Sequence, residues 1–171
     1  MITLKNILVA TDFSEPAEAA TDYGQDLARS YGATLHVMHV IEDMLAIYGP
    51  EFGLTLRPIE QNIEAAVQRD LDSRTASRND SFRTVVVRAS NVSHAITEYA
   101  KANAIDLIIV GTHGRSAVSR FLMGSVAERV VRTAPCPVLT VHAHERDLTE
   151  SRENGDAELA ADLEPITINS H

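Results

Sequence analysis

The sequence predicts an α/β fold, in which a five-stranded parallel sheet is covered by helices on both faces. Short runs of valine, isoleucine and leucine recur along the chain, and segments with apolar residues at helical spacing separate them. Such runs indicate strands buried on both faces, which the helices of right-handed crossover connections cover. The composition, with 44% hydrophobic and 23% charged residues, is that of a globular domain.

The first helix lies between the first two strands and has a signal at each end. After the apolar run at residues 7–10, Ser14 is expected to cap the helix, and Pro16 suits its first turn. Gly32 stands where a glycine commonly ends a helix, and residues 35–40 form the second strand. The apolar stripe of the helix consists of Ala17, Ala20, Gly24, Leu27, Ala28 and Tyr31.

A longer connection, residues 43–57, leads to the second helix. Pro58 is expected to start this helix, because the first turn leaves N–H groups unpaired and proline lacks one. The helical pattern fades near Asn79, and residues 84–87 form the third strand. The apolar stripe of this helix consists of Ile59, Ile63, Ala66, Val67 and Leu71.

The remaining elements complete the alternation of strands and helices. Apolar residues at helical spacing between 92 and 100 predict the third helix, and residues 107–110 form a fourth strand that runs into Gly111. A helix at residues 125–133 is expected to end before two prolines, and residues 138–141 form the fifth strand. The order is therefore β-α-β-α-β-α-β-α-β.

Strand ends and a glycine-rich segment indicate a binding site. Ligands bind such sheets outside the carboxyl ends of the strands, and Asp12, Val40 and Gly111 lie at such ends. Gly111 and Gly114 follow the fourth strand closely, and Gly124 opens the next helix. Glycine lets the backbone approach a ligand, and a helix N-terminus offers unpaired N–H groups and the positive end of a dipole. We therefore expect this segment to bind phosphate.

This segment also resembles the signature of a known family. The G-x2-G-x9-G-S spacing that begins at Gly111 is similar to the motif of the ATP-binding universal stress proteins. Residues 10–14, 39–41 and 134–138 resemble the same family, and the resemblance covers about residues 2–142. It implies a three-layer α/β/α, Rossmann-like fold of the adenine nucleotide alpha hydrolase type, with strand order 3-2-1-4-5.

The resemblance further implies ligands and a partner. The ligand would be ATP, or AMP or cAMP, with Mg²⁺ or Mn²⁺ on the phosphates, although no carboxylate stands out as a metal ligand. A homodimer would form through the last strand, since an apolar edge strand needs a cover.

The resemblance also implies a role for each site residue. Ala10 and Asp12 would hold the adenosine end of the nucleotide, and Val40 would meet the adenine. Val110, Gly111 and His113 would border the ribose and inner phosphates. Gly114, Gly124, Ser125, Val126 and Ala127 would hold the outer phosphates, and Arg115 would reach phosphate or solvent.

Each implied contact has a structural alternative. Asp12 can cap the first helix, and Ser125 with Glu128 matches a capping box, in which the serine bonds the backbone. The two glycines after the fourth strand can serve a tight turn alone. His113 is more typical of a loop residue than of a catalytic one.

The charge and the missing motifs narrow the function. A net charge of −9 argues against nucleic acid as the main partner. The chain has no G-x-x-x-x-G-K-[ST] loop, no G-x-G-x-x-G fingerprint and no G-x-S-x-G elbow. The resemblance implies an adenine-nucleotide-binding stress-response or signalling module, for which we expect little or no hydrolysis. Two alternatives stay open: a slow ATPase in which Asp12 or His113 places water, and a dimeric interaction protein that uses no nucleotide.

The end of the chain differs from the rest in charge. Residues 143–171 hold eight acidic and two basic residues, a net charge of −6, whereas residues 1–142 are expected to form the nucleotide-binding domain. We expect this acidic extension to be mobile or to dock on a sheet edge. A regulatory protein partner is a further expectation.

The sequence also predicts the cellular compartment. No apolar run approaches the roughly 20 residues that span a membrane, and the N-terminus lacks the pattern of a signal peptide. The single cysteine, Cys136, excludes an internal disulfide and fits a reducing compartment. A cytoplasmic protein without membrane insertion is expected.

Overall fold

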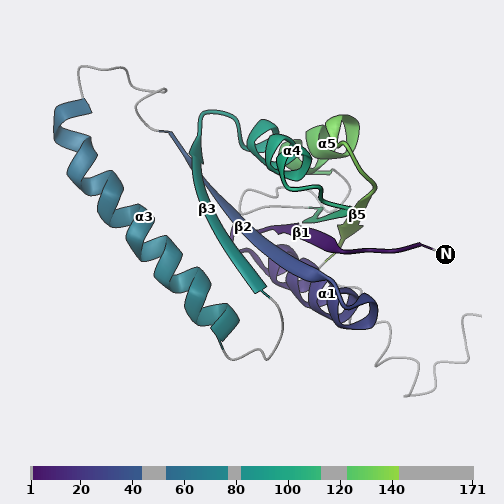
Figure 1. The fold of residues 1–171 in the computed structure, drawn as a ribbon. Helices are drawn as coiled ribbons and strands as arrows, with labels where there is room; N and C mark the ends of the chain where they lie inside the picture. The colour runs from purple at the N-terminus through teal and green to yellow at the C-terminus, as the bar shows by residue number, and fades with distance from the viewer. Residues whose placement is uncertain (1, 44–52, 77–81, 113–122, 143–171) are drawn as a thin grey trace, which may run out of the picture.

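The computed structural model describes residues 2–43, 53–76, 82–112 and 123–142, which form the predicted α/β fold (Figure 1). All strand pairs are parallel, and the order β3-β2-β1-β4-β5 confirms the expected one. The strands are β1 (Asn6–Ala10), β2 (Thr34–Glu42), β3 (Phe82–Ala89), β4 (Leu107–Gly111) and β5 (Val138–Val141). The helices in these ranges are α1 (Glu15–Tyr31), α3 (Gly53–Ala76), α4 (Val92–Ala102) and α5 (Ser125–Thr133).

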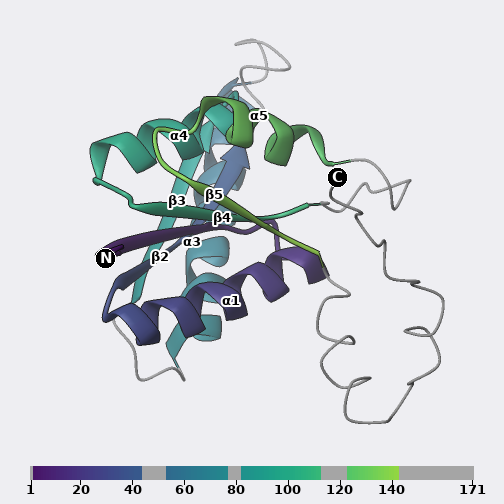
Figure 2. The same ribbon diagram turned by 90° about the vertical axis from the view of Figure 1, so that its right-hand side faces the viewer.

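The sheet is the middle of three layers (Figure 2). Helices α4 and α5 cover one face, and α1 and α3 cover the other. Each face has its own apolar cluster: Ile7 and Val9 belong to the cluster under α1, whereas Leu8 belongs to the cluster under α4 and α5. This two-residue repeat on a strand covered from both sides explains why β1 reads as a continuous apolar run.

Helix α1 approaches the sheet closely because a glycine faces it. A Cβ atom at Gly24 would lie 2.6 Å from Val9 Cγ2 and 3.1 Å from Leu35 Cδ1. The helix ends as predicted at Gly32, whose left-handed backbone (φ 64°, ψ 34°) lets its N–H reach the last turn. The backbone of α1 at Gly24 therefore packs directly against side chains of β1 and β2.

The predicted start of the second helix at Pro58 is wrong. Helix α3 begins earlier, at Gly53, and ends at Ala76. Pro58 lies inside the helix, where its missing N–H removes one bond, to the carbonyl of Leu54, while later turns keep theirs. Although α3 is long, no helix in the described ranges combines the length and apolar character that crossing a membrane requires.

Strands β2 and β3 extend beyond their apolar runs. Their pairing runs in register from Leu35 opposite Phe82 to Glu42 opposite Ala89. Backbone hydrogen bonds of a ladder do not depend on side-chain polarity, so the strands continue through polar residues such as Arg88. The predicted strands at 35–40 and 84–87 are thus correct in place but too short.

We predict that Gly24→Ala lowers the free energy of unfolding by about 1–3 kcal/mol, because the new Cβ overlaps the buried Val9 side chain. Urea denaturation measures this loss. In the double variant with Val9→Ala the overlap is relieved, so the loss should be smaller than the sum of the two single losses. Additive losses would contradict the packing described here.

A buried histidine lies on the α4 side of the sheet. His36 is 3% exposed, and its Nδ1 lies 2.9 Å from the hydroxyl of Tyr99. Burial, and second the charge of Arg83, hold the pKa of His36 below its ordinary value of 6.5. The core therefore contains a neutral imidazole.

We predict that acid destabilises the fold through His36. As the pH falls through about 6.5, His36 binds a proton in the unfolded chain but not in the folded chain. The free energy of unfolding that depends on a neutral His36 is therefore present above this pH and is lost below it. One proton contributes at most about 1.4 kcal/mol per pH unit. Unfolding free energies between about pH 7 and about pH 5 should fall less steeply for His36→Gln than for wild type. His94→Gln, which removes an exposed imidazole on α4, is the control, and equal slopes for wild type and His36→Gln would refute the idea.

Candidate functional site

The candidate site is a cavity of about 520 Å³ at the carboxyl ends of β1, β2 and β4, here named the strand-end cavity. Every described residue that the sequence singles out for binding lines this cavity. These residues are Ala10, Asp12, Val40, Val110, Gly111, Gly124, Ser125, Val126 and Ala127. The other three candidates, His113, Gly114 and Arg115, lie outside the described residues.

The structure adds wall residues that the sequence pattern does not single out. They are Thr11, Ala17, Met38, Glu42, Val92, Ile96 and Thr112. The apolar ones look like ordinary core positions, and α4 contributes to the wall only because the fold brings it there. Glu42 and Thr112 had a signal that could have been used, since each is a polar residue at or directly after a strand end.

The N-terminus of α5 opens into the strand-end cavity with amides that have no acceptor among the described residues. The Glu128 N–H donates to the Gly124 carbonyl (2.9 Å), so the amides of Ser125, Val126 and Ala127 precede the first intrahelical donor. The Gly124 N–H donates to the Thr112 carbonyl (2.7 Å). Gly124 therefore fixes the start of the helix, and the three residues after it supply the donors for an anion.

The capping-box alternative for this helix is wrong. The N-cap is Gly124, with extended backbone (φ −60°, ψ 146°), and Ser125 is the first helical residue. The carboxylate of Glu128 pairs with Arg132 (3.1 Å) instead of reaching back to the N-cap. Ser125 therefore lines the cavity without serving as the cap.

Asp12 is held in the turn between β1 and α1. Its Oδ1 accepts hydrogen bonds from the Ser14 N–H (3.1 Å) and from the Ser14 hydroxyl. Ser14 occupies the N-cap position as predicted, but its side chain bonds Asp12 and makes no capping bond to α1. The two bonds fix the carboxylate at the end of β1, on the wall of the cavity.

Gly111 is required by the packing of α1 beside the end of β4. A Cβ there would lie 2.9 Å from both the carbonyl carbon and the Cβ of Pro16. Among the described glycines only Gly32 has a positive φ, so space rather than backbone conformation demands glycine at 111. Its absent side chain lets the first turn of α1 reach the rim of the cavity.

The described wall offers carboxylates and amides rather than cationic side chains. Asp12 and Glu42 line it, and none of its described residues is lysine or arginine. Across the described ranges, no three His, Cys, Asp or Glu side chains gather to hold a metal ion. An anion in this cavity would therefore be held first by the amides at the start of α5.

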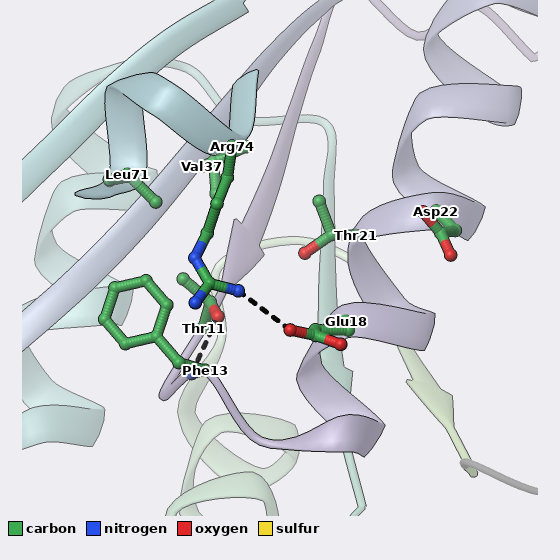
Figure 3. Close-up of a pocket in the computed structure, with 8 residues that line it drawn as sticks. All are labelled: Thr11, Phe13, Glu18, Thr21, Asp22, Val37, Leu71 and Arg74. Carbon is green, nitrogen blue, oxygen red and sulfur yellow. Dashed lines mark hydrogen bonds and ion pairs between the residues drawn. The ribbon is translucent and has the colours of Figure 1, made fainter. Parts of the chain in front are cut away.

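A second, smaller cavity of about 270 Å³ lies between α1 and α3, on the face of the sheet that these two helices cover (Figure 3). We name it the inter-helix cavity. It is lined by Thr11, Phe13, Glu18, Thr21, Asp22, Val37, Leu71 and Arg74. The sequence gives no sign of it, because its walls come from α1, α3, β2 and the turn after β1. Thr11 lines both cavities, so the turn after β1 separates them.

Comparison with known proteins gives consistent matches. The sequence profile of the universal stress protein family matches residues 3–142. Universal stress protein A homolog 1 of Coxiella burnetii is 35% identical over 138 residues, which cover 80% of this chain and 95% of that protein. The structure of universal stress protein UspA from Lactobacillus plantarum has a TM-score of 0.74 at 28% identity, covering 82% of this chain and 99% of that one. A universal stress protein in complex with cAMP shares the fold, with a TM-score of 0.58 at 24% identity and coverage of 83% and 99%.

Proposed function

Because this chain belongs to the universal stress protein family, we propose that it binds an adenine nucleotide, ATP above all, in the strand-end cavity. In this proposal it is a cytoplasmic stress-response or signalling module with little or no hydrolysis. The observation that carries the proposal is the set of three amides at the start of α5 for which the described part of the chain supplies no acceptor. Main-chain donors at a helix N-terminus favour a chain of phosphates without needing a lysine.

The nucleotide lies with its phosphates toward α5 and its adenosine end toward β1 and β2. The amides of Ser125, Val126 and Ala127 hold the outer phosphates, while Asp12 and the backbone near Ala10 hold the adenosine end. Val40, at the end of β2, meets the adenine. The strand order supports this division, because β1 and β2 are neighbours on one side and β4 leads to α5 on the other.

The remaining contacts complete the proposed site. Val110, Gly111 and His113 border the ribose and inner phosphates, and Gly114 and Arg115 close over the outer ones. A Mg²⁺ or Mn²⁺ ion is bound by the phosphate oxygens themselves, which suits a wall without a cluster of ligands in the described ranges. When bound, the ion neutralises phosphate charge that the described wall does not meet with cationic side chains.

Little hydrolysis is proposed because the two described carboxylates of the wall belong to the adenosine side. Asp12 follows β1 and Glu42 ends β2, whereas the outer phosphates face α5. A general base must lie within hydrogen-bond reach of the attacking water. AMP and cAMP are the alternative ligands, and the cAMP complex of another family member supports the capacity of this fold for an adenine nucleotide.

We predict that Ser125→Pro weakens ATP binding by about tenfold or more and leaves AMP within about twofold. Proline suits the first helical position, so the variant removes one amide donor and keeps α5. Isothermal titration measures both ligands. Ser125→Ala, which keeps the amide, is the matched control and should bind ATP nearly as wild type does.

Asp12→Asn should weaken ATP and AMP alike, because both ligands contain the adenosine end. A loss confined to ATP would reverse the proposed orientation, and a wild-type chain that gives no heat with either ligand would exclude nucleotide binding. Mass spectrometry of ligand released from protein purified without added nucleotide, and steady-state turnover with Mg²⁺, complete the test. Turnover well above zero would favour the slow-ATPase alternative.

We further propose that two chains pair through β5. This strand lies at the edge of the sheet, and Leu139 is 36% exposed. The carbonyls of Pro137 and Val141 accept bonds from the β4 side, so by the two-residue repeat Val138 and Thr140 direct their N–H and C=O groups outward. No other described strand than β4 pairs with β5, and an apolar edge of this kind needs a cover, which a second β5 supplies.

We predict that Thr140→Pro weakens the dimer by roughly tenfold, since two outward N–H groups are lost per dimer while the bonds to β4 remain. Sedimentation equilibrium measures the change. Thr140→Val keeps the N–H and should dimerise as wild type does. A wild-type chain that sediments as a monomer would overturn the proposal.

A further inference from the structure

The turn after β1 joins the two cavities. Asp12 lines the strand-end cavity, the next residue, Phe13, lines the inter-helix cavity, and Thr11 lines both. Any movement of this turn therefore moves the Asp12 carboxylate. The contacts that hold Phe13 in the inter-helix cavity therefore also set the position of Asp12 in the strand-end cavity.

Phe13 adopts a backbone conformation that a bulky residue rarely takes. Its φ of 62° lies in the left-handed region, which favours glycine. Its N–H donates to the hydroxyl of Thr11 (3.0 Å), which closes the turn. Strained backbone of this kind persists only where the surroundings hold it, and it is found at ligand-binding sites.

Two side chains hold the Phe13 ring from different elements. The ring of His39, on β2, has its centroid 4.6 Å away and is tilted by 30°. The guanidinium carbon of Arg74, on α3, lies 5.1 Å from the centre of the Phe13 ring, within range of a cation–π contact. We call this group of three the Arg74–Phe13–His39 stack.

His39 also holds the backbone of the turn. Its Nδ1 lies 2.8 Å from the Thr11 carbonyl, and because a carbonyl only accepts, Nδ1 carries the proton. The Thr11 N–H in turn donates to the Met38 carbonyl (2.9 Å). Strand β2 therefore fixes the turn through one side-chain bond and one main-chain bond.

Arg74 connects the stack to α1. Its guanidinium reaches past the Phe13 ring to Glu18 (2.8 Å) and also pairs with Asp70 of its own helix (3.0 Å), as Figure 3 shows for Glu18. The residue thus spans the inter-helix cavity from α3 to α1. Arg74 therefore links the position of α3 to the turn after β1.

We propose that the Arg74–Phe13–His39 stack is a positioning device that sets the affinity for the adenosine end by holding Asp12 toward the strand-end cavity. The proposal rests on the proposed nucleotide site and assigns α3 a part in tuning it. Arg74 and His39 are positioning residues, since they line or support the opposite side of the turn and act through Asp12.

The test is a double-mutant cycle read by isothermal titration with ATP. Arg74→Gln should weaken ATP binding by roughly two- to fivefold, the range of an exposed cation–π contact. The same substitution in an Asp12→Asn background should have no further effect, because the stack acts through that carboxylate. An equal loss in both backgrounds would show a general structural effect and overturn the proposal.

The matched control is Arg88→Gln. Arg88 ties β3 to Glu64 of α3 (3.6 Å) and does not belong to the stack, so its loss loosens α3 by a different route. Binding of ATP should stay within about twofold of wild type. A second variant, His39→Phe, keeps a ring against Phe13 and removes the bond to Thr11, and it should weaken ATP by about fivefold.

Hydrogen exchange separates this proposal from the proposed function. The Phe13 and Ser14 amides, both hydrogen-bonded in the turn, should exchange faster in Arg74→Gln than in Arg88→Gln without any nucleotide. Unchanged exchange would refute the stack as a holding device. If wild type binds no ATP, the proposed function fails, and faster exchange in Arg74→Gln would still support the hold on the turn.

Discussion

The close approach of α1 to the sheet is the constraint on which the rest of the structure depends. At Gly24 a Cβ would come within 2.6 Å of Val9, and at Gly111 one would come within 2.9 Å of Pro16. With no side chain between them, the first turn of α1 lies beside the end of β4, and the turn that carries Asp12 is drawn to the cavity rim. A bulkier residue at either glycine would separate these elements, because a close-packed interior has no room to absorb it.

The strand-end cavity divides into two chemical halves because of the sheet order. On the side of β1 and β2 it offers the carboxylates of Asp12 and Glu42, which suit hydroxyl and amino groups. On the side of β4 it offers the amides that begin α5, which suit an anion. Main-chain donors also explain how a chain with a net charge of −9 is compatible with a phosphate ligand. An attraction of this kind would be local and would not require a basic surface.

The turn after β1 shows how strain is offset by contacts from distant segments. A left-handed Phe13 costs about 1–3 kcal/mol. The ring contact with His39 contributes about 0.5–1.5 kcal/mol, the Arg74 contact about 0.5–1, and the bond from His39 to Thr11 about 0.5–1.5. These terms are of the same size as the cost, so the conformation depends on β2 and α3 together.

The sequence by itself determined the alternation of strands and helices, the ends of α1 and α5, and nine wall residues, since apolar periodicity, glycine, proline and strand ends are local signals. It misjudged the start of α3, which continues through Pro58, and it left open a capping box at Ser125 that the N-cap at Gly124 excludes. Only the tertiary structure decided that α4 completes the cavity and that Arg74 rests on Phe13, 61 positions away in the numbering of the chain. Contacts between distant segments follow from packing, which no local pattern encodes.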